Sequence, residues 1–306
     1  MDTAHSIESD STADAVVIRG VKLPLTDLVD RDALGPEALA EFQRRLRTAQ
    51  PFPHLVIDGL FNPDLLDLIA EEFDSTDWRG VTGRHQRTLR SVDCPNLGSA
   101  AQLYFDTIYS GWFIDWLSML TGVDHLLTDP KLVDGGLHET RRGGSFGVHR
   151  DFERHRKNGL RNEMVLITYL NKSWQEEWGG QLELWTSRRR VTQVFPVFGR
   201  TLLMIHGPAS FHGHPEPLHT PEGRSRRSVA SYFYTSPESA GYSQYAPESN
   251  FLHVGWSDHA KQIARLITPP ALYLGARSAR DRMKRRHSLS QASEERAVYL
   301  RGISRQ

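Results

Sequence analysis

The chain of 306 residues has a single cysteine, Cys94, and no excess of charge of either sign. One cysteine excludes an intramolecular disulfide framework and is typical of a reducing compartment. Basic and acidic residues number 37 each, so no overall charge attracts the chain to nucleic acid or to a membrane surface. No stretch approaches the ~20 apolar residues of a membrane-spanning helix, and the start "MDTAHSIESDSTADA" lacks the apolar core of a secretory signal. These absences predict a soluble cytoplasmic protein without nucleic-acid or membrane partners. They leave its oligomeric state open.

Changes in composition and in helix and strand pattern along the sequence predict four regions that together form one domain. They are a disordered lead-in (1–14), a support region of helices and strands (15–130), a β core (131–240) and a helical extension with a basic tail (241–306). The extension carries a helix at 257–267 that two prolines end, and the tail is interpreted as a solvated face.

The support region has recognisable helix signals. The stretch 35–48 predicts an amphipathic helix with Leu39, Phe42 and Leu46 on one face. After a short apolar strand at 51–61, Asn62 is the expected N-cap of a helix with Pro63 at its first position. A further helix is expected around 112–120, closed near Gly122.

The β core consists of short apolar runs that alternate with Gly, Pro, Asn and Asp turns. The runs are "EMVLITYL", "GGQLELW", "VTQVF", "RTLLMIH" and "SVASYFYT". Several short strands without intervening helices favour an antiparallel sandwich or barrel. The predicted class is therefore α+β, with helices packed against this β core.

Two clusters within the core could carry chemistry. In "FGVHRDFERH", residues His149 and Asp151 project from the same face if the run is extended. They form either a hydrogen bond on the surface or two of the three protein ligands of a metal ion. Further along, His212, His214 and His219 precede an arginine cluster and a strand.

Two histidines and one carboxylate occupy one face of an octahedral iron and leave positions open for other ligands and dioxygen. If a 2-oxo acid takes two of these positions, its far carboxylate needs a cationic partner. Arginine suits that task because it stays charged and binds a carboxylate through two nitrogens.

The chain resembles the prolyl-4-hydroxylase-like branch of the iron(II)- and 2-oxoglutarate-dependent dioxygenases. The resemblance runs from "PFPHLVIDGLFNPDLL" to "RRSVASYFYT" and is densest in "GGSFGVHRDFERH", "MVLITYLNKSWQEEWGGQLELW" and "FHGHPEPL". It implies a double-stranded β-helix (jelly roll) with flanking helices. It also implies Fe(II), 2-oxoglutarate as cosubstrate and O2, with ascorbate as a candidate additional cofactor.

The resemblance also implies the roles of single residues. His149, Asp151 and His212 are the expected iron ligands, with His214 and His206 as rivals for the third place. Arg226 is the expected anchor of the cosubstrate carboxylate, helped by Ser228 and the hydroxyl of Tyr169. The competing anchors are Arg224 and Arg227, although strand alternation places Arg226, Ser228 and Ala230 on one face and Arg227 on the other.

The predicted activity is hydroxylation of an unactivated C–H bond in an amino-acid, peptidyl or natural-product substrate, with release of succinate and CO2. Desaturation and ring formation are alternative outcomes. Two other classes remain open: a non-catalytic jelly-roll binding protein, and a zinc hydrolase with the same ligands. His155 and Arg142 either line the entrance of the pocket or belong to a solvated loop. The stretch 80–110 is expected to be a loop that shapes the pocket, and Cys94 is expected to be structural.

Overall fold

The computed structural model describes residues 14–83, 85–91, 97–236 and 250–251. All of them belong to the first of two units, Met1–Leu252. The predicted lead-in (except residue 14), Cys94, the helix at 257–267 and the basic tail lie outside the described residues. None of the described helices is long and apolar enough to cross a membrane.

The helices begin and end where local chemistry predicts. The Asn62 side chain accepts hydrogen bonds from two backbone N–H groups of the first turn of the second helix, which starts at Pro63. Gly122, with φ +73°, closes the fourth helix in a left-handed conformation. These predictions are confirmed. The helices are α1 (Pro36–Thr48), α2 (Pro63–Glu72), α3 (Ser99–Ile108) and α4 (Gly111–Thr121), with short 3-10 turns η1 (Leu25–Asp27), η2 (Asp32–Leu34), η3 (Phe73–Ser75) and η5 (Glu176–Trp178).

The core strands form two antiparallel groups in jelly-roll order. One group runs β7-β14-β9-β12 with β3 added at its edge, and the other runs β8-β13-β10-β11. Apart from the β10–β11 hairpin, successive strands from β7 to β14 alternate between the two groups, which is the winding of a double-stranded β-helix. The predicted fold is confirmed. The strands are β3 (His54–Asp58), β7 (Gly136–Thr140), β8 (Ser145–Arg150), β9 (Arg161–Tyr169), β10 (Leu182–Trp185), β11 (Arg190–Val194), β12 (Arg200–Ile205), β13 (Phe211–His214) and β14 (Arg226–Thr235).

Shorter strands complete the described part. A separate hairpin consists of β1 (Ala15–Ile18) and β2 (Val21–Pro24), while β6 (Leu127–Thr128) pairs with β14 and β15 (Asn250–Phe251) pairs with β8.

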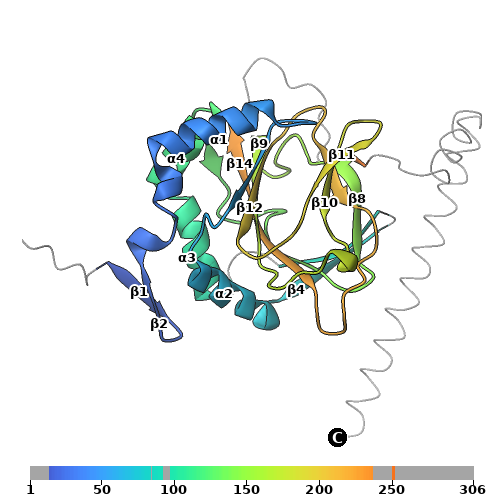
Figure 1. The fold of residues 1–306 in the computed structure, drawn as a ribbon, viewed down its shortest axis with the longest axis horizontal. Coiled ribbons are helices and arrows are strands. Elements are labelled where there is room, and N and C mark those ends of the chain that lie inside the picture. The colour runs from blue at the N-terminus through green and yellow to red at the C-terminus, as the bar shows by residue number, and fades with distance from the viewer. Residues whose placement is uncertain (1–13, 84, 92–96, 237–249, 252–306) are drawn as a thin grey trace, which may run out of the picture. The chain divides into compact units, whose positions relative to one another are not determined.

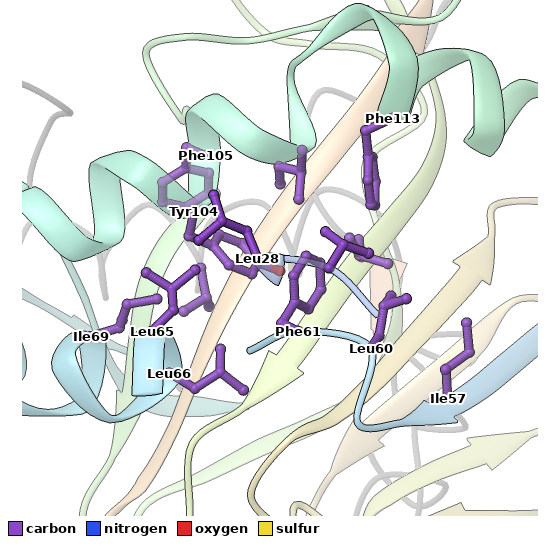
Figure 2. Packing of buried hydrophobic residues seen from close by; sticks show 14 of the residues in the cluster. Leu28, Ile57, Leu60, Phe61, Leu65, Leu66, Ile69, Tyr104, Phe105 and Phe113 are labelled. Atoms are coloured by element: carbon purple, nitrogen blue, oxygen red, sulfur yellow. The ribbon is translucent and has the colours of Figure 1, made fainter. Parts of the chain in front are cut away.

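Alternation along β9 divides the interior into two apolar clusters. Met164 and Leu166 belong to the cluster formed with the helices, whereas Val165 belongs to the cluster between the two strand groups. Figure 1 shows the helices on one side of β9, β12 and β14, with β8, β10 and β11 on the other side. Figure 2 shows residues of the helix-side cluster, including Phe61, packed between α2 and α4.

The stretch 80–110 is more regular than the loop expected from sequence. It contains a hairpin of β4 (Trp78–Thr82) and β5 (Gln86–Ser91), followed by α3. Strand β5 pairs with β7 through Leu89 and Arg90 and with β8 through Gln86 and Arg87, so it joins the two groups. This pairing aims alternate side chains of β5 at the space between the groups.

Candidate metal and cosubstrate site

His149 lies near the end of β8, and Asp151 directly follows the last residue of that strand. Both side chains are buried, and His149 Nε2 lies 3.2 Å from Asp151 Oδ1. The other ring nitrogen, Nδ1, lies 2.9 Å from the carbonyl oxygen of Gly147. Because a carbonyl only accepts hydrogen bonds, this contact places a proton on Nδ1. Nε2 then faces the Asp151 carboxylate, where either a shared proton or a metal cation would join the two groups.

His212 on β13 repeats this arrangement. Its Nδ1 lies 3.0 Å from the carbonyl oxygen of Ser210, and its Nε2 lies 3.5 Å from Asp151 Oδ2. In the pairing of β13 with β8, His212 lies directly opposite His149. One ligand atom from each of His149, Asp151 and His212 lies within 4.8 Å of the others. Three ligand atoms that converge in this way could hold a metal ion, and two imidazoles with one carboxylate suit ferrous iron.

The electrostatics favour the forms that bind metal. Burial lowers the pKa of His212 to about 4, so its imidazole is neutral near pH 7. Burial also acts to raise the pKa of Asp151. The charges and N–H groups of His212, His149 and His206 in their protonated forms outweigh burial and hold it well below its usual range. A metal cation would take the place of those protons and keep the carboxylate charged.

The rival histidines occupy different positions. His206 Nε2 lies 3.2 Å from Asp151 Oδ2, yet within the described part of the chain neither ring nitrogen has a hydrogen bond of good geometry. His206 is also absent from the group of atoms within 4.8 Å of one another. His214 lines the cavity two residues beyond His212, and its Nδ1 is buried without a partner among the described residues.

Arg226, at the start of β14, is a buried cation that faces the same cavity. Its Nε donates to the Gly180 carbonyl oxygen at 2.8 Å, and its Nη2 donates to Tyr169 Oη at 3.3 Å. Its guanidinium also lies 4.9 Å from the centroid of the Tyr169 ring. In the described part of the chain, Arg226 forms no ion pair with a carboxylate. A buried guanidinium in that situation is a ready site for an anionic ligand.

Gly180 makes this approach possible. Its φ of +77° is accessible to glycine, and an added Cβ would lie 2.7 Å from Leu218 Cδ2 and 3.1 Å from Arg226 Cδ. The glycine therefore allows its carbonyl to hold Arg226 without a side chain displacing the arginine.

The neighbouring arginines point elsewhere. Arg224 is exposed, donates to the Lys172 carbonyl oxygen at 2.8 Å and lies over Trp178. Arg227 pairs with Asp74 at 3.0 Å. Neither lines the cavity, whereas the expected helper Ser228 does. Tyr169 is buried but does not line the cavity, so its hydroxyl acts on Arg226 and does not face the space itself.

The cavity has a volume of about 270 Å³ and mixed walls. Apolar side chains from both strand groups line it near the histidines: Phe146, Phe152, Val165, Ile167, Leu182 and Ala230. Such walls exclude water from a reactive centre. Polar residues lie along β5, β7 and the segments beside them, among them Gln86, Thr88, Arg90, Asp134, His138 and Arg156.

Most of this polar wall is not predicted by the sequence. His155 and Arg142, the two candidates for the entrance, do not line the cavity: His155 Nε2 contacts Asp129 at 3.1 Å, and Arg142 donates to the Thr220 carbonyl. The neighbour Arg156 lines it instead. No local alternation marks β5, because four of the five residues in "QRTLR" are polar.

Comparison with known protein families agrees with this geometry. The family model of the 2OG-Fe(II) oxygenase superfamily matches residues 135–234, the stretch from β7 to the end of β14. This core belongs to the 2OG-Fe(II) oxygenase superfamily. The predicted recognition is confirmed, and the family of this core is one of 2-oxoglutarate-dependent dioxygenases whose cofactors are Fe(II), 2-oxoglutarate and O2. Among curated proteins, none matches the sequence significantly.

Solved structures similar to the chain include three prolyl hydroxylases. A Pseudomonas putida prolyl-4-hydroxylase is 20% identical, with 65% of this chain and 100% of that chain covered and a TM-score of 0.44. A Trichoplax adhaerens prolyl hydroxylase, in complex with a peptide fragment of the hypoxia inducible factor oxygen degradation domain, is 14% identical, with 65% and 93% covered and a TM-score of 0.46. A Phytophthora capsici prolyl 4-hydroxylase is 17% identical, with 79% and 74% covered and a TM-score of 0.47.

Proposed function

We propose that this 2OG-Fe(II) oxygenase uses His149, Asp151 and His212 to hold iron(II), Arg226 with Ser228 to bind the far carboxylate of 2-oxoglutarate, and the remaining cavity to bind a small-molecule or peptidyl substrate. The reaction is oxidation of an unactivated C–H bond, with hydroxylation as the principal outcome. The observation that carries the proposal is one cavity lined by both a converging His–Asp–His set and a buried arginine without a carboxylate partner among the described residues.

Each residue has a task in this proposal. The Nδ1 contacts of His149 and His212 with backbone carbonyls set the orientation of both rings, so that Nε2 of each ring is the atom that binds the metal. Asp151 supplies the negative charge of the set. Arg226, held by the Gly180 carbonyl and Tyr169, offers its remaining N–H groups to a carboxylate.

When bound, iron(II) with 2-oxoglutarate and dioxygen supplies the oxidising power, and the cosubstrate leaves as succinate and CO2. The protein contributes placement of the cosubstrate, an apolar wall that excludes water, and orientation of the substrate. No side chain has to act as a general base in this chemistry. The buried arginine binds the carboxylate of the cosubstrate, whereas a zinc hydrolase would give it no role.

The test is binding and turnover by the purified full chain. Anaerobic addition of iron(II) and 2-oxoglutarate should give a metal-to-ligand charge-transfer band, and air should then yield succinate. His212→Ala should lose the band and Arg226→Gln should weaken 2-oxoglutarate binding by about 100-fold. Arg224→Gln is the matched control, because it removes a nearby exposed arginine that does not line the cavity.

Different results would point to the alternatives. A wild-type protein that binds neither iron(II) nor 2-oxoglutarate would favour a non-catalytic jelly roll. A protein that binds zinc, shows no charge-transfer band with iron(II) and hydrolyses ester or amide probes would favour a hydrolase.

A further inference from the structure

The polar wall of the cavity contains a charged cluster that the proposed chemistry does not use. Arg90 Nη1 lies 2.6 Å from Asp134 Oδ1, and Arg156 Nη2 lies 3.1 Å from the same oxygen. All three side chains line the cavity. The exposed fractions of the side chains are 20% for Arg90, 16% for Asp134 and 43% for Arg156, so this part of the wall reaches solvent.

One carboxylate cannot neutralise two guanidinium groups, so the cluster keeps one positive charge. Among the described residues, the other charged side chains of the cavity wall are those of Asp151 and Arg226. The proposed function, on which this inference rests, assigns Asp151 to iron(II) and Arg226 to dianionic 2-oxoglutarate. The charges of these two residues, the metal and the cosubstrate sum to zero. The excess positive charge therefore lies in the part of the cavity that is left for the substrate.

Arg90 also has an unused donor. Its Nε is buried and has no hydrogen-bond partner among the described residues. A buried guanidinium N–H without an acceptor is unfavourable, and the planar fork of arginine matches two carboxylate oxygens. A ligand carboxylate would supply the acceptor that the protein does not.

The neighbour of Arg90 adds no charge of its own. His138 lies opposite Arg90 in the pairing of β5 with β7 and opposite Ser228 in the pairing of β7 with β14. Its Nε2 is buried without a partner among the described residues, so it offers an acceptor to a ligand N–H or O–H. The wall thus presents cationic donors and a neutral acceptor side by side, next to the strand that carries Ser228.

We propose that the substrate carries a carboxylate that binds Arg90 and Arg156, and that this contact presents a neighbouring C–H bond to the metal centre. A carboxylate is favoured over a phosphate monoester because a single negative charge matches the single excess positive charge of the cluster. Arg90 is then a specificity-determining residue for an acidic small molecule or a peptide C-terminus.

The test uses the full chain loaded with Mn(II) and saturating 2-oxoglutarate, and it measures paramagnetic relaxation of ligand protons by NMR. The matched probes are 4-methylpentanoate and 4-methylpentanamide, which differ in charge but hardly in shape. The carboxylate should bind at least 10-fold more tightly than the amide. Arg90→Gln should weaken carboxylate binding by about 10- to 100-fold and leave amide binding unchanged.

Matched variants keep the test specific. Arg87→Gln removes an exposed arginine from the same strand, three residues away and outside the cavity wall, and should leave carboxylate binding unchanged. Arg156→Gln is a second, more exposed variant in case Arg90→Gln fails to fold, and should also weaken binding of the carboxylate selectively. A charge-transfer band with iron(II) and 2-oxoglutarate should persist in all three variants.

Three results would overturn the inference while that band persists. They are equal binding of acid and amide, equal binding of the acid by wild type and Arg90→Gln, and no relaxation of either probe. Loss of the band in the wild type would instead overturn the proposed function, on which the charge count depends.

Discussion

His212 lies directly opposite His149 across the antiparallel pair of β13 and β8, and the centroids of their rings are 4.6 Å apart. The two residues are far apart in the sequence, and the pairing of two strands brings them to the same carboxylate. We therefore expect His212→Ala to abolish stoichiometric iron binding, measured by anaerobic calorimetry.

His206 provides the discriminating comparison. Its Nε2 lies 3.2 Å from Asp151 Oδ2 without a hydrogen bond of good geometry, and His206 does not belong to the converging set. We therefore expect it to act on the charge of the carboxylate and not to bind the metal. His206→Asn should lower iron affinity by about 10- to 100-fold while keeping one site per chain. Loss of the site in His206→Asn with retention in His212→Ala would reverse the assignment of the third ligand.

Gly180 offers a second prediction. Gly180→Ala should strain a backbone with φ +77° and press on Arg226, so 2-oxoglutarate binding should weaken by at least about 10-fold. Gly199→Ala is the matched control, since Gly199 has φ +76° and nothing within 4 Å of an added Cβ. Both variants should lose about 1 kcal/mol of stability from the backbone alone. Titration of the charge-transfer band separates the two, and an equal loss of affinity in both would refute the contact argument.

The sequence predicted the fold and the residues of the proposed site better than it predicted the walls of the cavity. Residues two apart in an extended run lie on the same face, so the local spacing of His149 and Asp151 is enough to predict that their side chains lie together. Likewise, alternation correctly separated Arg226 and Ser228, which line the cavity, from Arg227, which pairs outside it.

The polar residues of the cavity wall could not be predicted from any local sequence pattern. Strand β5 has only partly buried or exposed positions, so it lacks the apolar alternation that marks a strand in sequence. It forms because β7 and β8 offer free edges to which it pairs, and those edges are set by the tertiary fold. Arg90 and Asp134, 44 residues apart, meet only through that pairing.

Substitution of Tyr169 tests whether its hydroxyl contacts the cosubstrate directly. Its hydroxyl accepts a hydrogen bond from Arg226 and does not line the cavity, so Tyr169→Phe removes one positioning contact. A net hydrogen bond is worth about 0.5–1.5 kcal/mol, so 2-oxoglutarate affinity should fall about 3- to 10-fold, with iron affinity unchanged. A loss near 100-fold would mean that the hydroxyl binds the cosubstrate itself.

His138 should make the stability of the protein depend on pH. Burial, aided by the charge of Arg90, lowers the pKa of His138 to about 4. In the unfolded chain a histidine has a pKa of about 6.5, so below that pH the unfolded state takes up a proton that the folded state refuses. Stability is therefore complete above about pH 6.5 and is lost as the pH falls towards 4.

The size of this effect can be measured by substitution. From the two pKa values, His138 should cost about 2 kcal/mol of unfolding free energy at pH 5 relative to pH 7. His138→Gln cannot take up that proton, so the loss between pH 7 and pH 5 should be smaller in the variant by about this amount. Urea unfolding of both proteins at the two pH values provides the measurement, and parallel losses would exclude His138 as the source.

The helix layer should stabilise the fold without tuning the site. Phe113 is fully buried between Phe61 and Trp116 in the cluster on the helix side of β9 (Figure 2), while its neighbour Trp112 is 47% exposed. Phe113→Ala should therefore lower the unfolding free energy by about 3–5 kcal/mol, and Trp112→Ala by about 1 kcal/mol or less, in urea titrations.

The Phe113→Ala variant also tests whether the two faces of the sheet are energetically independent. The proposed metal ligands, Arg226 and Ser228 line the cavity, whereas Phe113 packs on the opposite face of the sheet, and additivity holds for sites that share no contacts. In conditions where Phe113→Ala is still folded, its affinity for 2-oxoglutarate should equal that of the wild type within about twofold. A large loss of affinity in the folded variant would show that the helices set the position of β14, and hence of Arg226, through the sheet.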